Sequence, residues 1–391
     1  MPQVFSSPPL GVYVHVPFCA SRCGYCDFNT YTPRELDGKT GPEAYLEALE
    51  KELAMAAAQL ADSSTPGPAG TVFVGGGTPS LLGGRGLARI YRAIDRTIGI
   101  APGAEVTTES NPESTDPGFF AAIREAGYNR VSLGMQSASA GVLEVLGRRH
   151  TPGRAVAAAG EAARAGFSHI NLDMIYGTPT ETDADVEATL DAVLSAGVDH
   201  VSAYSLIVED GTAFARKVAK GILPAPDDDV LAHRYQLIDT ALSGAGMQWY
   251  EVSNWAAPGG MCRHNMGYWC GANWWGAGPG AHSHIDGRRF FNVKHPFRYH
   301  AMLTGGQSAV DGGETLSTAD RHTEEIMLGL RLRQGIDISR LSAAAQAEAA
   351  AYSRRGLLHT FRAAGTTRLA VTGAGRLLAD GIIAALLAAE D

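Results

Sequence analysis

Short apolar runs recur along the first half of the chain, and each has the length of a buried strand. They occupy residues 12–18, 71–74, 105–109, 130–135, 170–175 and 201–206. The segments between them repeat apolar residues every three or four positions, as Tyr45, Leu49 and Leu53 do after Pro42, which is typical of amphipathic helices. The pattern therefore predicts alternating strands and helices.

This alternation carries no hairpin signal, so it favours a parallel sheet with right-handed helical crossovers, either flat or curled into a partial barrel. In both forms the carboxyl ends of the strands make one edge, where such folds bind their ligands. Each predicted strand ends in or precedes a chemically distinctive group, at residues 19–26, 75–79, 109–112, 134–137, 173–179 and 204–206. The fold class is thus α/β with one reactive edge.

The order of elements changes beyond about Gly211. A glycine- and aromatic-rich stretch runs from Trp249 to Phe291, and helical patterns then surround one strand-like run at 368–371. We expect a core at 1–245, a connecting region at 246–310, and a smaller, mostly helical, winged-helix-like domain at 311–391. In an acidic chain, such a domain more often covers a neighbouring domain than binds DNA.

Three cysteines, Cys19, Cys23 and Cys26, have the spacing CxxxCxxC directly after the first apolar run. A loop this short can turn three thiolates onto one small metal centre, whereas a closed zinc or electron-transfer site needs four protein ligands. An iron without a protein thiolate can take a substrate or cofactor. The alternative interpretation is a zinc site completed by Cys262 and Cys270.

This motif resembles that of the radical S-adenosylmethionine (SAM) superfamily, whose three cysteines hold a [4Fe–4S] cluster and leave the fourth iron for SAM. The resemblance implies a partial (β/α)6 barrel with Cys19, Cys23 and Cys26 as the cluster ligands. In that superfamily, backbone at the turn after the second strand binds the amino group of SAM. The matching residues here are Gly76, Gly77 and Thr78.

Polar residues also lie in or after buried-looking strands, where an unpaired carboxylate would be costly. Each could be structural, as a salt bridge or a helix cap, but together they suit a ligand with an amine, a carboxylate and a ribose diol. The chain resembles the coproporphyrinogen oxidase and HemW branch of the superfamily from Tyr13 nearly to its end. That resemblance implies a cofactor site lined by Tyr13, Tyr25, Gly76, Gly77, Thr78, Glu109, Gln136, Arg148 and Asp173, with Ser205 as a further candidate.

Two functions compete within this branch. Oxygen-independent coproporphyrinogen III oxidases carry another cysteine two residues after the third cluster ligand, and a long N-terminal extension. Here Phe28 takes that position and the first strand begins near residue 12. Both departures favour a heme chaperone that passes heme to a client protein over an oxidase that decarboxylates propionates through a 5′-deoxyadenosyl radical. Whether SAM is cleaved, and so whether the protein is an enzyme, stays open.

The residues His264, Asn265, Tyr268 and Trp269 form an HNxxYW motif, which is characteristic of HemW-type heme chaperones. Imidazole is a good axial ligand of heme iron, and Tyr and Trp offer flat faces to the macrocycle. We therefore predict heme binding at His264, Tyr268 and Trp269. Core packing is the alternative, and Cys262 and Cys270 are alternative ligands. The glycine-rich residues 276–283 predict a turn that faces the cofactor edge.

Composition limits the partners. The chain has 32 Lys and Arg against 41 Asp and Glu, a net charge of −9, which argues against nucleic-acid binding and tRNA modification. We see neither a signal peptide nor an apolar run long enough to span a membrane, and five cysteines suit a reducing compartment. We expect a cytoplasmic monomer or homodimer that binds small-molecule cofactors and a heme-accepting client, including transient contact with membrane-bound clients.

Overall fold

The computed structural model describes residues 8–36, 40–148 and 150–390. Its core contains six strands: β1 (Gly11–Val16), β2 (Ala69–Gly76), β3 (Ile100–Ser110), β4 (Arg130–Gln136), β5 (His169–Tyr176) and β6 (His200–Ser205). These strands are neighbours in chain order, and every neighbouring pair is parallel. The predicted α/β fold with a parallel core is confirmed.

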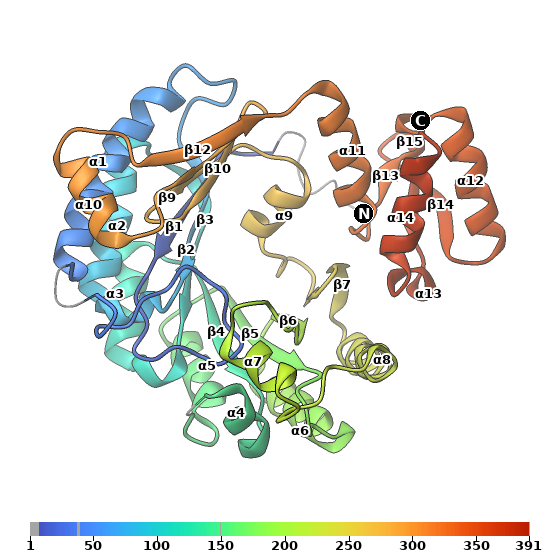
Figure 1. Ribbon diagram of the computed structural model, residues 1–391, viewed down its shortest axis with the longest axis horizontal. Coiled ribbons are helices and arrows are strands. Elements are labelled where there is room, and N and C mark those ends of the chain that lie inside the picture. Colours follow the sequence, from blue (N-terminus) through green and yellow to red (C-terminus); the bar gives the residue numbers. More distant parts are fainter. Residues whose placement is uncertain (1–7, 37–39, 149, 391) are drawn as a thin grey trace.

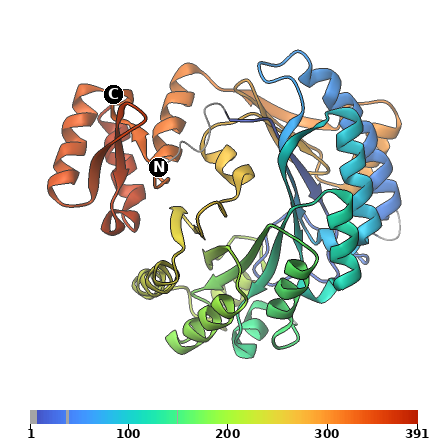
Figure 2. The same ribbon diagram turned by 180° about the vertical axis from the view of Figure 1, so that it is seen from behind.

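Helices cover the outer face of this sheet, as Figures 1 and 2 show. They are α1 (Pro42–Leu60), α2 (Gly83–Thr97), α3 (Pro117–Ala126), α5 (Arg154–Arg164) and α6 (Asp183–Ser195), with 3-10 turns η1 (Pro79–Leu82) and η2 (Pro112–Ser114). The short helix α4 (Ala140–Leu146) lies instead at the carboxyl edge, where it packs with Tyr25 of the cysteine loop. The predicted stripe on α1 is buried in the same core as Val12 and Val14 of β1. Because side chains alternate along a strand, Tyr13 and His15 lie on the opposite, concave side.

The chain after β6 extends both edges of the sheet. Its elements are α7 (Ala213–Ala219), α8 (Asp228–Gly244), β7 (Gln248–Glu251), β8 (Asn254–Ala256), α9 (Arg263–Trp269), β9 (Trp274–Ala277), β10 (His282–Ile285), β11 (Arg288–Asn292), α10 (Pro296–Thr304) and β12 (Val310–Thr315). The sheet order is β12-β11-β10-β9-β1-β2-β3-β4-β5-β6-β8-β7. The segment expected to connect two domains thus supplies strands to the barrel, and α9 lies within its curve (Figure 1).

The junction between β1 and β9 is fastened from the outer side by one buried carboxylate. Glu52 of α1 accepts hydrogen bonds from the Gly278 amide (2.8 Å), the Asn292 side chain (2.7 Å) and the Tyr299 hydroxyl. These donors come from the turn after β9, from β11 and from α10. A charged residue in the middle of a helix therefore fixes the position of the β9–β11 strands beside the barrel.

The C-terminal part is mostly helical, as predicted. It contains α11 (Thr318–Gly329), β13 (Ile336–Asp337), η3 (Ile338–Arg340), α12 (Ala343–Arg354), β14 (Leu358–Ala363), β15 (Thr366–Val371), α13 (Gly373–Arg376) and α14 (Ala379–Ala388). Its strands form a separate antiparallel sheet in the order β13-β15-β14. This domain lies beside α8 and α9, away from the helices that cover the outer face of the barrel (Figure 1).

Candidate functional site

The three clustered cysteines lie in the loop after β1, at the carboxyl edge of the parallel sheet. All three are free thiols and partly buried. Burial raises the pKa of the Cys23 and Cys26 thiols, and each also feels the negative charge of a neighbouring cysteine. The loop is fixed by a hydrogen bond from the Gly24 amide to the Leu146 carbonyl (3.3 Å). Three thiols thus converge on one small region.

This donor set fits a cluster better than a single ion. Among the described ranges, no three His, Cys, Asp or Glu side chains are close enough to hold one metal ion. A four-iron cluster makes a different demand, because each thiolate binds its own iron. Cys262 and Cys270 lie elsewhere: the Cys262 thiol is 3.4 Å from Glu105, and the Cys270 sulfur is 3.9 Å from the Gln334 amide nitrogen. They do not complete a zinc site with the loop.

The glycine turn after β2 packs against the start of the cysteine loop. The Gly77 amide donates to the Val16 carbonyl (2.8 Å), and the Thr78 amide donates to the Phe18 carbonyl (2.7 Å). A side chain at residue 77 would strike the Phe18 carbonyl, with its Cβ 2.5 Å from that oxygen, so glycine is required. A protonated amino group is a hydrogen-bond donor, so at this turn it would bind to oxygen acceptors, such as the backbone carbonyls, and not to the amides.

Two carboxylates, Glu109 and Asp173, lie on the concave side of the sheet, close enough for the charge of Asp173 to act on Glu109. Glu109 of β3 accepts from the Gly76 amide (3.0 Å), and Asp173 of β5 accepts from the side chains of Ser132 (2.9 Å) and Asn171 (2.6 Å). Burial, followed by the negative charge of Asp173, raises the pKa of Glu109 to about 8. Burial also raises the pKa of Asp173. A cationic ligand would relieve both effects. The amino group and sulfonium of SAM have that charge.

Gln136 and Arg148 complete the predicted polar set. Gln136 ends β4 with a φ of 67°, a left-handed conformation that is rare outside glycine and frequent at functional sites. The Arg148 guanidinium donates to the Tyr25 hydroxyl at 3.1 and 3.2 Å, and Tyr25 lies between two of the cysteines. Burial raises the pKa of Tyr25 to about 12. Arg148 therefore places a positive charge directly beside the cysteine loop.

Tyr13 lies deeper on the concave side than these residues. Its hydroxyl is 3.0 Å from His15 Nδ1, and His15 Nε2 is 2.9 Å from the Asn29 carbonyl in the cysteine loop. Three further residues on this face, Ser132, Asn171 and His15, are not among those predicted from the sequence. The signal that could have found them is the two-residue period of each strand, which places them on the same face as Tyr13, Glu109 and Asp173.

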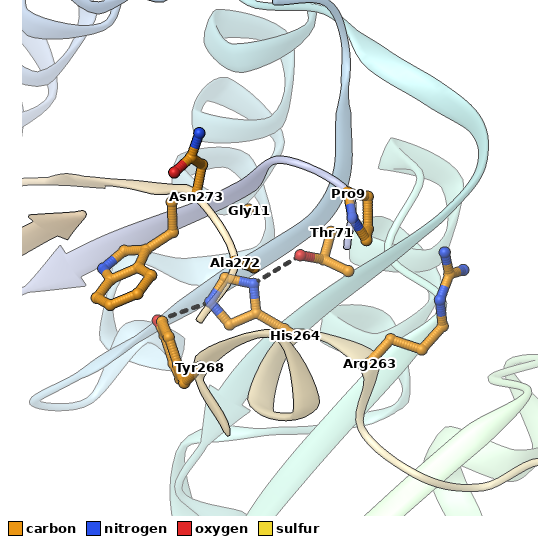
Figure 3. A pocket seen from close by; sticks show the side chains of 10 residues that line it. Pro9, Gly11, Thr71, Arg263, His264, Tyr268, Ala272 and Asn273 are labelled. Atoms are coloured by element: carbon orange, nitrogen blue, oxygen red, sulfur yellow. Dashed lines mark hydrogen bonds between the residues drawn. The ribbon is translucent and has the colours of Figure 1, made fainter. Parts of the chain in front are cut away.

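The HNxxYW motif forms α9, and Figure 3 shows its histidine between two hydroxyl groups. His264 Nδ1 is 2.9 Å from the Thr71 hydroxyl, and Nε2 is 2.8 Å from the Tyr268 hydroxyl. The ring stacks on Phe73, with centroids 5.4 Å apart. Burial lowers the pKa of His264 to about 3, so this imidazole is neutral. The adjoining cavity measures about 10 Å³, at most the space of one water molecule.

Trp269 points to a different side of α9. It packs with Tyr250, Met266 and Leu332, next to the C-terminal domain. Asn265 of the same motif donates to Glu251 at 2.7 Å. The structure therefore brings His264 and Tyr268 together and separates Trp269 from them. Heme binding by these three residues stays a prediction, and in this arrangement iron could reach His264 Nε2 only after Tyr268 had moved.

Comparisons with known proteins agree with this fold. Residues 13–193 match the radical SAM superfamily, and residues 316–378 match the HemN C-terminal domain. The solved structure of coproporphyrinogen III oxidase (HemN) from Escherichia coli, a radical SAM enzyme, covers 98% of this chain and is itself covered to 91%, with a TM-score of 0.82. The sequence identity is 23%, so this likeness concerns the fold.

Two relatives share much more sequence. A protein named heme chaperone HemW from Mycobacterium tuberculosis (strain ATCC 25618 / H37Rv) is 57% identical over 379 residues, covering 97% of this chain and 95% of the relative. A protein of the same name from Escherichia coli (strain K12) is 35% identical over 294 residues, covering 74% and 75%. The chain therefore belongs to the HemW family of the radical SAM superfamily.

Proposed function

We propose that this protein is a heme chaperone that carries a [4Fe–4S] cluster and SAM and passes heme to a client protein. The observation that carries the proposal is the match over 97% of the chain with a relative named heme chaperone HemW. The residue at position 28 supports it, because Phe28 stands where the oxidases have a cysteine, and its side chain is 58% exposed beside the cysteine loop. The shared fold alone does not separate the two functions.

In this proposal the residues of the carboxyl edge hold the cofactors. Cys19, Cys23 and Cys26 ligate the cluster, and the carbonyl oxygens around Gly76 accept from the amino group of SAM. Glu109 and Asp173 stabilise the positive charge of SAM. Gln136, Arg148, Tyr13 and Tyr25 line the remaining polar surface, with the Arg148 cation held beside the loop by Tyr25. When bound, such a cluster can supply an electron to SAM.

We expect the protein to act in the cytoplasm, because its cysteines suit a reducing compartment. We expect it to be a monomer or a homodimer. None of the described helices has both the length and the apolar character needed to cross a membrane. We propose that contact between this protein and a membrane-bound client is transient. The acidic composition argues against nucleic acid as a partner.

The test compares heme binding with oxidase activity in the anaerobically reconstituted protein. We expect about four iron and four sulfide per chain, binding of heme with a shifted Soret band, and no conversion of coproporphyrinogen III to protoporphyrinogen IX with SAM and reductant. Turnover at about 0.01–1 per second would instead support the oxidase. Absence of heme binding by the wild-type protein would refute the chaperone proposal.

Cysteine variants test the cluster assignment in the same preparation. Replacing Cys19, Cys23 and Cys26 together with Ala should abolish the iron and sulfide content. The matched control replaces Cys262 and Cys270 with Ala and should keep both, because these thiols lie away from the loop. Retention of iron by the triple variant, or one zinc ion per wild-type chain, would contradict the assignment.

A further inference from the structure

A histidine that ligates heme iron needs a free ring nitrogen and space beside it for a flat macrocycle. His264 has neither in this structure, because both of its nitrogens contact hydroxyl groups and its cavity holds at most one water. Two further histidines, His282 and His284, lie on β10. His284 is buried, and its Nδ1 is 3.0 Å from the Ala272 carbonyl. His282 differs from both.

His282 begins β10 and is exposed. Within the described part of the chain, no side chain or backbone group makes a hydrogen bond with its imidazole, and its backbone carbonyl accepts from Trp274 Nε1 at 2.9 Å. The ring is held by stacking on Phe291, its cross-strand partner on β11, with centroids 5.3 Å apart and planes 29° apart. Its ring nitrogens are thus available to a metal while its orientation is fixed.

The surroundings of His282 offer flat apolar faces. Trp274 and Phe291 are only partly buried. Trp274 contacts Tyr268 edge to face, with centroids 4.8 Å apart, and Tyr13 stacks on Phe73 along the neighbouring strands at 6.3 Å. Large aromatic side chains left partly open in this way suit a planar aromatic ligand, because burying its faces supplies most of the binding free energy.

The charge beside His282 suits the propionate groups of heme. Lys294 is exposed, and no described carboxylate lies within ion-pair distance of it. Partial burial of the ring and the positive charge of Lys294 lower the pKa of His282, which favours the neutral imidazole that binds metals. The backbone carbonyl of Lys294 also accepts from the Asn29 side chain at 2.9 Å, so the backbone at this residue is tied to the cysteine loop.

We propose that His282 is an axial ligand of heme iron, with the macrocycle against Phe291 and Trp274 and a propionate at Lys294. This inference rests on the proposed chaperone function and assigns its cargo to the β9–β11 strands rather than to the cavity at His264. It places the heme beside the turn 278–281, where a Cβ on Gly278 would lie 2.4 Å from the His15 carbonyl. Cargo and cluster would then occupy the same edge of the sheet.

The test measures heme affinity and the ferric-heme electron paramagnetic resonance spectrum of the full-length, reconstituted protein. His282→Ala should remove the imidazole-ligated signal and weaken heme binding about tenfold, with the iron and sulfide content of the cluster unchanged. Added free imidazole should restore the signal. Lys294→Ala should weaken binding without changing the signal, because it removes a charge and not the ligand.

The control is His359→Ala, since His359 is also exposed and stacks on a phenylalanine, Phe361, at 5.4 Å, but in the C-terminal sheet. It should change neither quantity, and His264→Ala should keep the imidazole signal. An unchanged signal and affinity in His282→Ala would overturn this inference and leave the chaperone function standing. Loss of the signal in His264→Ala alone would do the same in favour of His264. A wild-type protein that binds no heme would refute the proposed function itself.

Discussion

Glu109 and Asp173 are two partly buried carboxylates on the concave side of the sheet. Burial raises the pKa of both carboxyl groups, and the negative charge of Asp173 raises the pKa of Glu109 further. Most folded proteins avoid such pairs unless a cation joins them. A site that binds a cationic cofactor instead keeps them, because the relief of repulsion is part of the binding free energy.

The first prediction concerns pH and Glu109. The pKa of about 8 in the folded protein exceeds the unfolded value of about 4.3, so the folded state binds this proton more tightly. The free energy of unfolding should therefore fall as pH rises from about 4.5 to about 8. Glu109→Gln should remove this part of the decline and stabilise the cofactor-free protein at pH 8.5 by about 1–3 kcal/mol.

Urea denaturation at pH 5.5 and 8.5 measures the free energy of unfolding of the wild type and the variant. Calorimetry measures their affinity for SAM. The same variant should bind SAM at least about tenfold more weakly, since one carboxylate no longer faces the cation. Greater stability with weaker binding is the expected combination. A variant that is destabilised equally at both pH values would show that Glu109 is only a structural acceptor for Gly76.

At the scale of single elements, α9 is held in place by a carboxylate at its first turn. Glu105 of β3 accepts from the backbone amides of Arg263 (3.0 Å) and His264 (2.9 Å), and its carboxylate lies 3.8 Å from the Arg130 guanidinium. The two charged side chains are nearly inaccessible to solvent. A negative charge at a helix N-terminus satisfies amides that have no partner within the helix.

Removal of Glu105 should therefore be costly. Glu105→Ala leaves the Arg130 charge buried without a counter-ion and should lower the free energy of unfolding by about 3–5 kcal/mol. Glu43→Ala is the control, because Glu43 pairs with Arg89 while 81% exposed and should change stability by less than about 1 kcal/mol. Equal effects in chemical denaturation would mean that Glu105 does not anchor α9.

The parallel core could be predicted because each of its strands contains an apolar run that can be recognised in the sequence without knowledge of its partner. The strands β7 to β12 could not, since they are short, β9 and β12 contain glycine, and β9 pairs with the distant strand β1. The same limit applies to the site. Glu109 and Asp173 stand out in apolar runs, but the bond between His264 and Thr71 joins residues 193 positions apart, and no local pattern reports it.

At the scale of the whole molecule, Arg376 is one of several contacts between the C-terminal domain and the rest of the chain, beside a backbone bridge between Glu251 and Leu332. Arg376 of α13 donates to both carboxylate oxygens of Asp239 on α8, at 2.8 and 2.9 Å. Its guanidinium also lies 4.6 Å from the Trp249 ring centroid on β7. The planar guanidinium group can bind both carboxylate oxygens and stack on the Trp249 ring at once, which the ammonium group of lysine cannot. This contact therefore helps to hold the domain beside α8.

Arg376→Ala should loosen the C-terminal domain while leaving the barrel intact. Loss of a charged hydrogen-bonded pair and a cation–π contact is worth about 2 kcal/mol, which would speed amide exchange in α13 and α14 roughly 30-fold. Hydrogen–deuterium exchange with mass spectrometry measures this change. Arg340→Ala, which breaks an exposed pair with Glu325 in the same domain, is the control. Faster exchange in β1–β6 as well would indicate global destabilisation instead.

The parallel pairing of β1 with β9 has a consequence for how the protein is made. Gly11 pairs with Trp274, so about 260 residues separate the partners along the chain. At roughly 5–20 residues per second, a ribosome needs about 13–50 seconds to synthesise that interval. During this time one edge of the first strand is bare, and the three cysteines have already left the exit tunnel. The cysteine loop would therefore be accessible for cluster delivery before the strands β9 to β11, which include His282, have paired with the barrel.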